Sequence, residues 1–113
     1  MTRRLYLDNS ATSFPKPPEV LAAMTRFATE LGASPGRGAY AEAREAGALL
    51  QRCRERIVEL VGGAAPEQVI FTLNATDALN LAIRGLLRPG DHAVTTRFEH
   101  NSVLRPLNRL VEE

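Results

Sequence analysis

The chain has few residues of several kinds, and each shortage excludes a class of chemistry. A single cysteine, Cys53, excludes an internal disulfide and a multi-cysteine metal site, and it indicates a reducing compartment. Lys16 is the only lysine among fourteen basic residues, so a reaction that needs a lysine amine uses Lys16 or another chain. No apolar run approaches the roughly 18 residues of a membrane span. We therefore expect a soluble, cytoplasmic protein that has no metal site and no membrane partner.

The charge of the chain is nearly balanced. Fourteen Lys and Arg residues against thirteen Asp and Glu residues give a formal net charge of +1. Such a balance provides no bulk attraction toward nucleic acid or an anionic membrane surface. With 44% apolar and 5% aromatic residues in 113, the composition is that of one ordinary globular domain.

Helical spacing dominates the first half of the chain. A short extended arm is expected at residues 4–10, before a proline-rich stretch. Apolar residues then recur at steps of three and four over residues 19–31 and again over residues 40–61, which predicts two helices. Gly32 and Gly62 directly follow these segments and are placed to end them. Cys53 lies on the apolar stripe of the second helix, which favours a buried, unreactive thiol.

The second half alternates between strand-like and helical patterns. Short β-branched runs at residues 69–72 and 93–96 flank a helical pattern at residues 76–87. This order is typical of a βαβ unit with a right-handed crossover and a parallel sheet. A last helix is predicted to run to Glu113, with Asn101 or Ser102 as its cap.

Two strands cannot form a stable sheet by themselves, because each keeps an unpaired edge and an uncovered face. We therefore expect an α/β fold that is incomplete as a domain within these 113 residues. The sequence pattern changes from helical to alternating strand and helix near residues 62–66. We expect the boundary between the helical first part of the chain and the α/β second part there.

The turn from the first predicted strand into the helix at residue 76 is the first candidate site. The N–H groups of a first helical turn have no intrahelical partners and lie at the positive end of the helix dipole. The backbone amides of Ala75 and Thr76, together with the Thr76 hydroxyl, therefore form a candidate phosphate site. The alternative is an ordinary cap by Asn74 or Thr76 with nothing bound.

His100 is the second candidate. It follows the second predicted strand, and open α/β sheets bind ligands beyond the carboxyl ends of their strands. An imidazole in that position acts as an acid or base, or stacks on a ring. The alternative is a surface histidine that makes a local turn contact.

Three segments, in this order and spacing, carry a resemblance to a known family. They are residues 5–12 (LYLDNSAT), 71–83 (FTLNATDALNLAI) and 98–107 (FEHNSVLRPL). Together they resemble the start of class V aminotransferase-like enzymes, and the cysteine desulfurase and selenocysteine lyase branch is most similar. The resemblance implies the fold-type I architecture of pyridoxal-phosphate (PLP) enzymes, a large domain with a mainly parallel sheet and a small domain built from both chain ends.

This resemblance assigns parts and residues. Residues 1–63 are expected to be the N-terminal arm and small-domain helices, and residues 64–113 the start of the large PLP-binding α/β domain. Ala75 and Thr76 match the positions that hold the cofactor phosphate, with Asn74 beside them, and His100 matches the histidine that stacks on the pyridine ring.

The chain also departs from the family pattern. It does not include the lysine that binds the cofactor covalently, the aspartate that pairs with the pyridine nitrogen, the arginine that binds the substrate carboxylate or the reactive cysteine. Neither Lys16 nor Cys53 matches those positions, and Lys16 is better interpreted as a solvated charge. The resemblance thus implies an N-terminal fragment, inactive alone, that binds PLP weakly or not at all.

The parent enzyme implied by the resemblance is a homodimer that converts cysteine, or selenocysteine, to alanine and passes the sulfur to an enzyme thiol. Two alternatives stay open. One is a fragment of another class V aminotransferase, and the other is a non-enzymatic phosphate-binding or interaction module.

Overall fold

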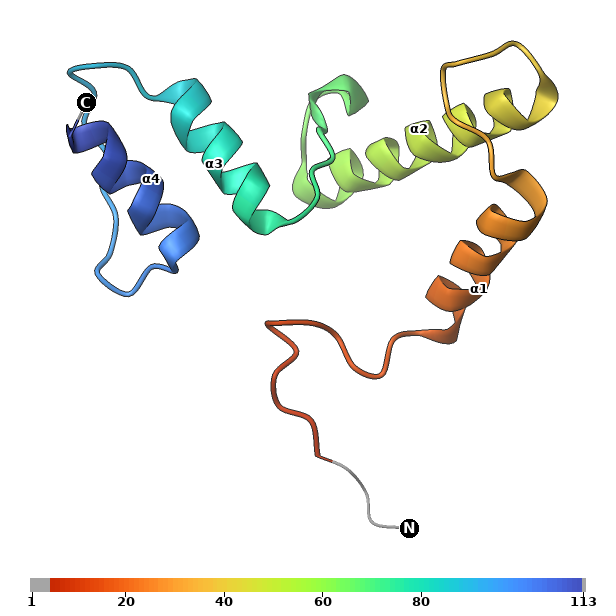
Figure 1. Cartoon of the computed structure of the whole chain (residues 1–113), viewed down its shortest axis with the longest axis horizontal. Coiled ribbons are helices and arrows are strands. Elements are labelled where there is room, and N and C mark those ends of the chain that lie inside the picture. The colour runs from red at the N-terminus through yellow and green to blue at the C-terminus, as the bar shows by residue number, and fades with distance from the viewer. Residues whose placement is uncertain (1–4, 113) are drawn as a thin grey trace. The chain divides into compact units, whose positions relative to one another are not determined.

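The computed structural model describes residues 5–112 as helices joined by irregular segments, with no strand among those residues (Figure 1). The elements in chain order are α1 (Pro18–Arg26), the π-helical η1 (Phe27–Leu31), α2 (Ala41–Val61), the 3₁₀ turn η2 (Pro66–Gln68), α3 (Ala75–Leu86) and α4 (Asn101–Glu112). The chain divides into two units between Pro66 and Glu67.

Both predicted helices of the first half are confirmed. The pattern at residues 19–31 forms α1 and continues as η1, and the pattern at residues 40–61 forms α2. Gly32 and Gly62 end them in the left-handed conformation, with φ of 51° and 67°. A Cβ atom disfavours this conformation, so glycine is the residue that ends a helix here at no steric cost.

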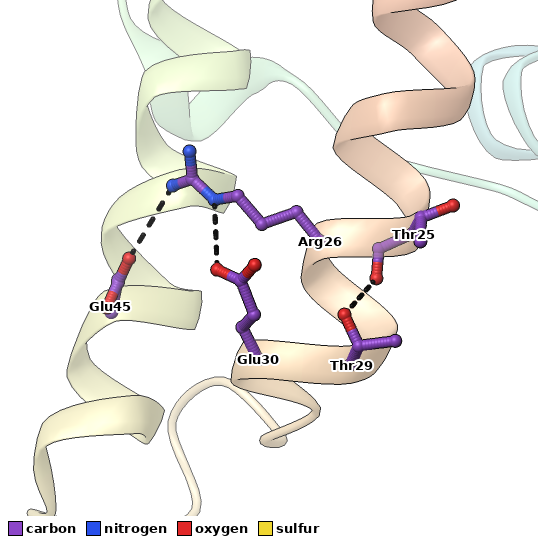
Figure 2. A network of polar contacts seen from close by, with 5 residues as sticks. All are labelled: Thr25, Arg26, Thr29, Glu30 and Glu45. Carbon is purple, nitrogen blue, oxygen red and sulfur yellow. Dashed lines mark hydrogen bonds and ion pairs between the residues drawn. The ribbon is translucent and has the colours of Figure 1, made fainter.

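Arg26 joins the three helical segments of the first unit, as Figure 2 shows. Its Nε lies 3.9 Å from Oε2 of Glu30 on η1, and its Nη2 lies 3.9 Å from Oε1 of Glu45 on α2. On the same helical segment, the Thr29 hydroxyl donates to the Thr25 carbonyl at 2.9 Å. All three charged side chains are largely exposed, so each ion pair adds only about 0–1 kcal/mol.

The buried thiol expected at Cys53 is wrong, because Cys53 is exposed. It lines an open pocket of about 690 Å³ between the α1–η1 segment and α2. On α2 the only buried side chains are the small Ala43 and Ala46. Cys53 and Leu49 do lie on the apolar stripe of α2. Within the described residues, however, little besides η1 packs against α2, so these two side chains remain exposed.

The second unit is built on two helices. The pattern at residues 76–87 forms α3, and the last predicted helix forms α4; Glu113, its predicted end, lies outside the described residues. The helices α3 and α4 pack against each other, and Figure 1 shows them running in the same direction. The starts of both helices therefore lie at the same end of the pair.

The two predicted strands are not confirmed. Residues 69–72 and 93–96 have no regular secondary structure, and Val94 is 88% exposed. A β-strand is defined by hydrogen bonds to a neighbouring strand, and within residues 5–112 these two segments do not pair. The segment after α3 returns along the helix pair, because α4 runs parallel to α3 (Figure 1).

Many apolar side chains remain exposed, among them Leu60, Leu73, Val94 and Phe98. Within residues 5–112, no helix combines the length and the apolar character needed to cross a bilayer.

Gly47 within α2 and Gly62 at its C-terminal cap provide a matched stability test. An added Cβ meets no atom within 4 Å at Gly62 or at Gly47, so only the backbone conformation distinguishes them. We expect Gly62→Ala to destabilise the helix by about 1–2 kcal/mol, because φ is positive there. Gly47→Ala, in the helix interior, is expected to stabilise it by about 0.5–1 kcal/mol. Urea unfolding followed by far-UV circular dichroism measures both, and shifts of the same sign would contradict the assignment.

Candidate functional site

Asn74 organises the start of α3. Its extended backbone, with φ of −165°, precedes the helix, and its Oδ1 accepts the backbone N–H of Asp77 at 2.9 Å. The Asn74 carbonyl accepts the N–H of Ala78 at 3.2 Å and the Thr72 hydroxyl at 2.9 Å. Of the two caps left open by the sequence, the structure therefore has Asn74.

The cap leaves the first two helical amides available. Ala75 and Thr76 are the first two residues of α3, where an N–H group has no acceptor within the helix. Both residues are exposed. The Thr76 carbonyl accepts Nδ2 of Asn80 at 2.9 Å, which ties the first turn to the second. The helix dipole favours an anion at this position by about 0.3–2 kcal/mol, in competition with the Asp77 carboxylate of the same turn.

His100 stands at the start of α4 and caps it. Its carbonyl accepts the N–H groups of Val103 at 2.9 Å and Leu104 at 3.2 Å. Its Nδ1 accepts the N–H of Ser102 at 3.1 Å and lies 2.9 Å from the Ser102 hydroxyl. The prediction that Asn101 or Ser102 caps this helix is wrong, because the imidazole of the preceding residue occupies the place of the usual short polar side chain.

Hydrogen bonds of the Thr96 hydroxyl stabilise the turn that precedes His100. The Thr96 hydroxyl donates to Oε1 of Glu99 at 3.0 Å and accepts the N–H of Phe98 at 3.3 Å. Phe98 points into solvent with 98% of its surface exposed. The imidazole of His100 is itself exposed, so the ring is fixed by local bonds and still presents a free face.

The parallel packing of α3 and α4 places both helix starts at one end of the pair (Figure 1). Ala75 and Thr76 are the first residues of α3, and His100 directly precedes α4. The groups that these residues offer match the chemistry of PLP. Its phosphate needs N–H and hydroxyl donors, and its ring needs a flat surface for stacking.

The N-terminal arm folds on itself in the first unit. The Tyr6 hydroxyl lies 2.9 Å from the carbonyls of both Asp8 and Thr12, and Asn9 Oδ1 accepts the N–H of Phe14 at 3.2 Å. Lys16 is exposed, as expected for a solvated charge, and it also donates to Thr12 Oγ1 and the Ser13 carbonyl, both at 3.0 Å. Sequence reasoning missed this role, although a lysine four residues after a threonine in a turn-rich segment was a usable signal.

Comparison with known proteins gives the family. The family model described as Aminotransferase class-V matches residues 5–113. The chain belongs to the class-V aminotransferase family. The match extends over all three sequence segments that carry the resemblance, and it confirms that resemblance.

Curated relatives of this class-V chain are named for one activity. A protein of Methanothermobacter thermautotrophicus named "Probable cysteine desulfurase" is 38% identical across 96% of this chain and 27% of its own length. The mitochondrial cysteine desulfurase of Drosophila melanogaster is 36% identical across 98% of this chain and 24% of its own length, and the human cysteine desulfurase is 36% identical across 98% and 25%. The chain thus spans about a quarter of the length of the relatives it matches.

The cap at Asn74 can be tested through the amide that it holds. Asn74→Ala is expected to cost about 1 kcal/mol of local stability, which corresponds to roughly fivefold faster hydrogen exchange at the Asp77 amide. Asn108→Ala, an exposed position late in α4, is the matched control and should leave that amide unchanged. Equal exchange rates at Asp77 in the Asn74 variant and the unmodified chain would contradict the cap.

Proposed function

We propose that this chain is the amino-terminal part of a PLP-dependent cysteine desulfurase, the enzyme that converts cysteine to alanine and passes the sulfur to an enzyme thiol. The observation that carries the proposal is that two parallel, packed helices start at the same end of the α3–α4 pair, α3 at Ala75 and α4 directly after His100. The desulfurase names of relatives that match 96–98% of the chain support the choice of reaction.

Each residue of the site has a defined task in this proposal. The amides of Ala75 and Thr76 and the Thr76 hydroxyl bind the cofactor phosphate. Asn74 fixes the start of α3, so that these amides remain pointed outward. The imidazole of His100 stacks on the pyridine ring, held by its bonds to Ser102. When bound, PLP supplies an electron sink for the amino acid substrate.

The fold-type I sheet belongs to the same proposal. In the whole protein, residues 69–72 and 93–96 pair with further strands as parts of a mainly parallel sheet. Their β-branched composition and the parallel course of α3 and α4 support this arrangement. Residues 1–63 then contribute the arm and the small-domain helices, and residues 64–113 begin the large domain.

This chain's own residues bind and orient, and they do not carry out the covalent steps. The only lysine, Lys16, is engaged in the arm, and the only cysteine, Cys53, lies on α2 in the first unit. We therefore expect the 113-residue chain to be inactive alone and to hold PLP weakly. The complete enzyme is expected to be a homodimer that acts on cysteine or selenocysteine.

A second reaction deserves a direct comparison, because the matching family model is described at the level of class-V aminotransferases. A transaminase releases a keto acid from its amino acid substrate, whereas a desulfurase releases alanine and, with a reductant present, sulfide. Product analysis of the complete enzyme with cysteine distinguishes the two. The cytoplasmic location stays a prediction, and the Drosophila relative is named as mitochondrial.

The phosphate assignment is tested by Thr76→Val, which keeps the branched shape and removes the hydroxyl. Loss of one hydrogen bond to a charged group costs about 1.5–3 kcal/mol, so the affinity for PLP should fall roughly 10- to 150-fold. Absorbance titration and cofactor retention after dialysis measure this in the protein that contains the chain.

Cys53→Ala is the control for that experiment. Cys53 lies in the other unit, on the surface of α2, so PLP affinity and alanine formation should stay within about twofold of the unmodified protein. Unchanged PLP affinity in Thr76→Val would remove the phosphate site, and a loss of turnover in Cys53→Ala would show that the reactive thiol was assigned wrongly.

A further inference from the structure

Ser102 is the one buried polar side chain of the second unit that lies directly beside the candidate site. Only 7% of its surface is exposed, although it stands in the first turn of a helix between exposed Asn101 and half-buried Val103. Its hydroxyl is 2.9 Å from Nδ1 of His100, and its backbone N–H donates to the same nitrogen at 3.1 Å. Two groups of one residue thus converge on one ring atom.

This geometry fixes the position of the ring proton. A backbone N–H is only a donor, so Nδ1 must offer its single in-plane lone pair as the acceptor. A ring nitrogen that accepts carries no proton, and the proton of the neutral imidazole is then on Nε2. The Ser102 hydroxyl, at hydrogen-bond distance from the same lone pair, becomes the second donor.

We propose that Ser102 is a positioning residue for His100: its backbone N–H sets the tautomer, and its hydroxyl, as a second donor at Nδ1, fixes the plane of the exposed imidazole. The inference rests on the proposed function, in which that imidazole stacks on the cofactor ring. It adds that Nε2 is the ring nitrogen that remains available to the ligand as a hydrogen-bond donor.

Physical reasons make this role consequential. An exposed imidazole has a broad χ2 distribution and two tautomers, so an unrestrained ring must lose that freedom when a ligand stacks on it. A ring already held at Nδ1 loses less, which raises affinity by pre-organisation. The low exposure of Ser102 keeps water from taking over the bond that its hydroxyl makes.

Ring nitrogen NMR tests the positioning directly, in the chain without cofactor. At alkaline pH, where imidazole side chains are neutral, long-range ¹H–¹⁵N spectra report which nitrogen is protonated. The chain has two histidines, and exposed His92 serves as the internal reference. We expect His100 to be protonated at Nε2 alone, with ring shifts distinct from those of His92.

Ser102→Ala is the decisive variant, and Ser34→Ala, at an exposed loop position, is the matched control. Alanine is smaller and suits a helix, so folding should be preserved. Ser102→Ala keeps the backbone N–H and loses the hydroxyl, so His100 should stay protonated at Nε2 while its Nδ1 resonance moves toward that of His92. Ser102→Thr, which retains a hydroxyl, is expected to restore that resonance in part. Ser34→Ala should change nothing. Identical His100 spectra in Ser102→Ala and the unmodified chain, or a His100 spectrum that matches His92 from the start, would overturn the proposal.

Titration with PLP separates this inference from the function on which it rests. A lost hydrogen bond of about 0.5–1.5 kcal/mol corresponds to a 2- to 12-fold lower PLP affinity in Ser102→Ala. Changed ring shifts with unchanged affinity would refute the positioning role. If the complete protein that contains this chain binds no PLP while the ring shifts behave as expected, the proposed function fails and Ser102 still stands as the residue that fixes the imidazole.

Discussion

The parallel packing of α3 on α4 is the constraint on which the candidate site depends. Two helices that run in the same direction place both of their N-terminal ends on one side, and each end carries N–H groups without intrahelical partners. An antiparallel pair joined by a short turn would place those ends on opposite sides. The residues between Leu86 and Asn101 are long enough to return along the pair, and this return makes the convergence of the two helix starts possible.

The two helix starts are capped in different ways, and the difference suits different ligand groups. At α3 the short Asn74 side chain takes the third amide of the turn and leaves the first two directed outward, an arrangement suited to a phosphate. At α4 the larger imidazole of His100 serves as the cap and remains exposed, so that a flat aromatic surface stands where an oxygen atom is usual. A single physical requirement, satisfying the first-turn amides, thus leaves two open amides at one helix and an exposed imidazole at the other.

The first unit shows what happens when amphipathic helices have few partners. The stripe on α2 buries only Ala43 and Ala46, while Leu49 and Leu60 stay exposed, and the contacts that link α2 to α1 and η1 include the solvent-exposed ion pairs of Arg26 (Figure 2). Such pairs orient the segments and add little stability, since burial of apolar area is the dominant favourable term in folding. Relatives about four times as long as this chain have further segments with which such stripes could pack.

Sequence alone determined the helices and the family, and it located the candidate site residues. The three-to-four spacing and the terminal glycines located α1 with η1, α2 and α3 to within about one residue, because these signals act between residues close in the chain. The turn at residues 74–76 and the histidine at 100 were recognisable for the same reason.

Pairing of residues 69–72 with 93–96 was not determined locally, because a strand exists only through a partner that the sequence pattern does not supply. Burial at Cys53 and the cap of α4 likewise depended on which groups come into contact in three dimensions. Only the tertiary structure showed that the imidazole of His100, fixed by the buried Ser102, closes the start of α4 at the same end as the open amides of α3.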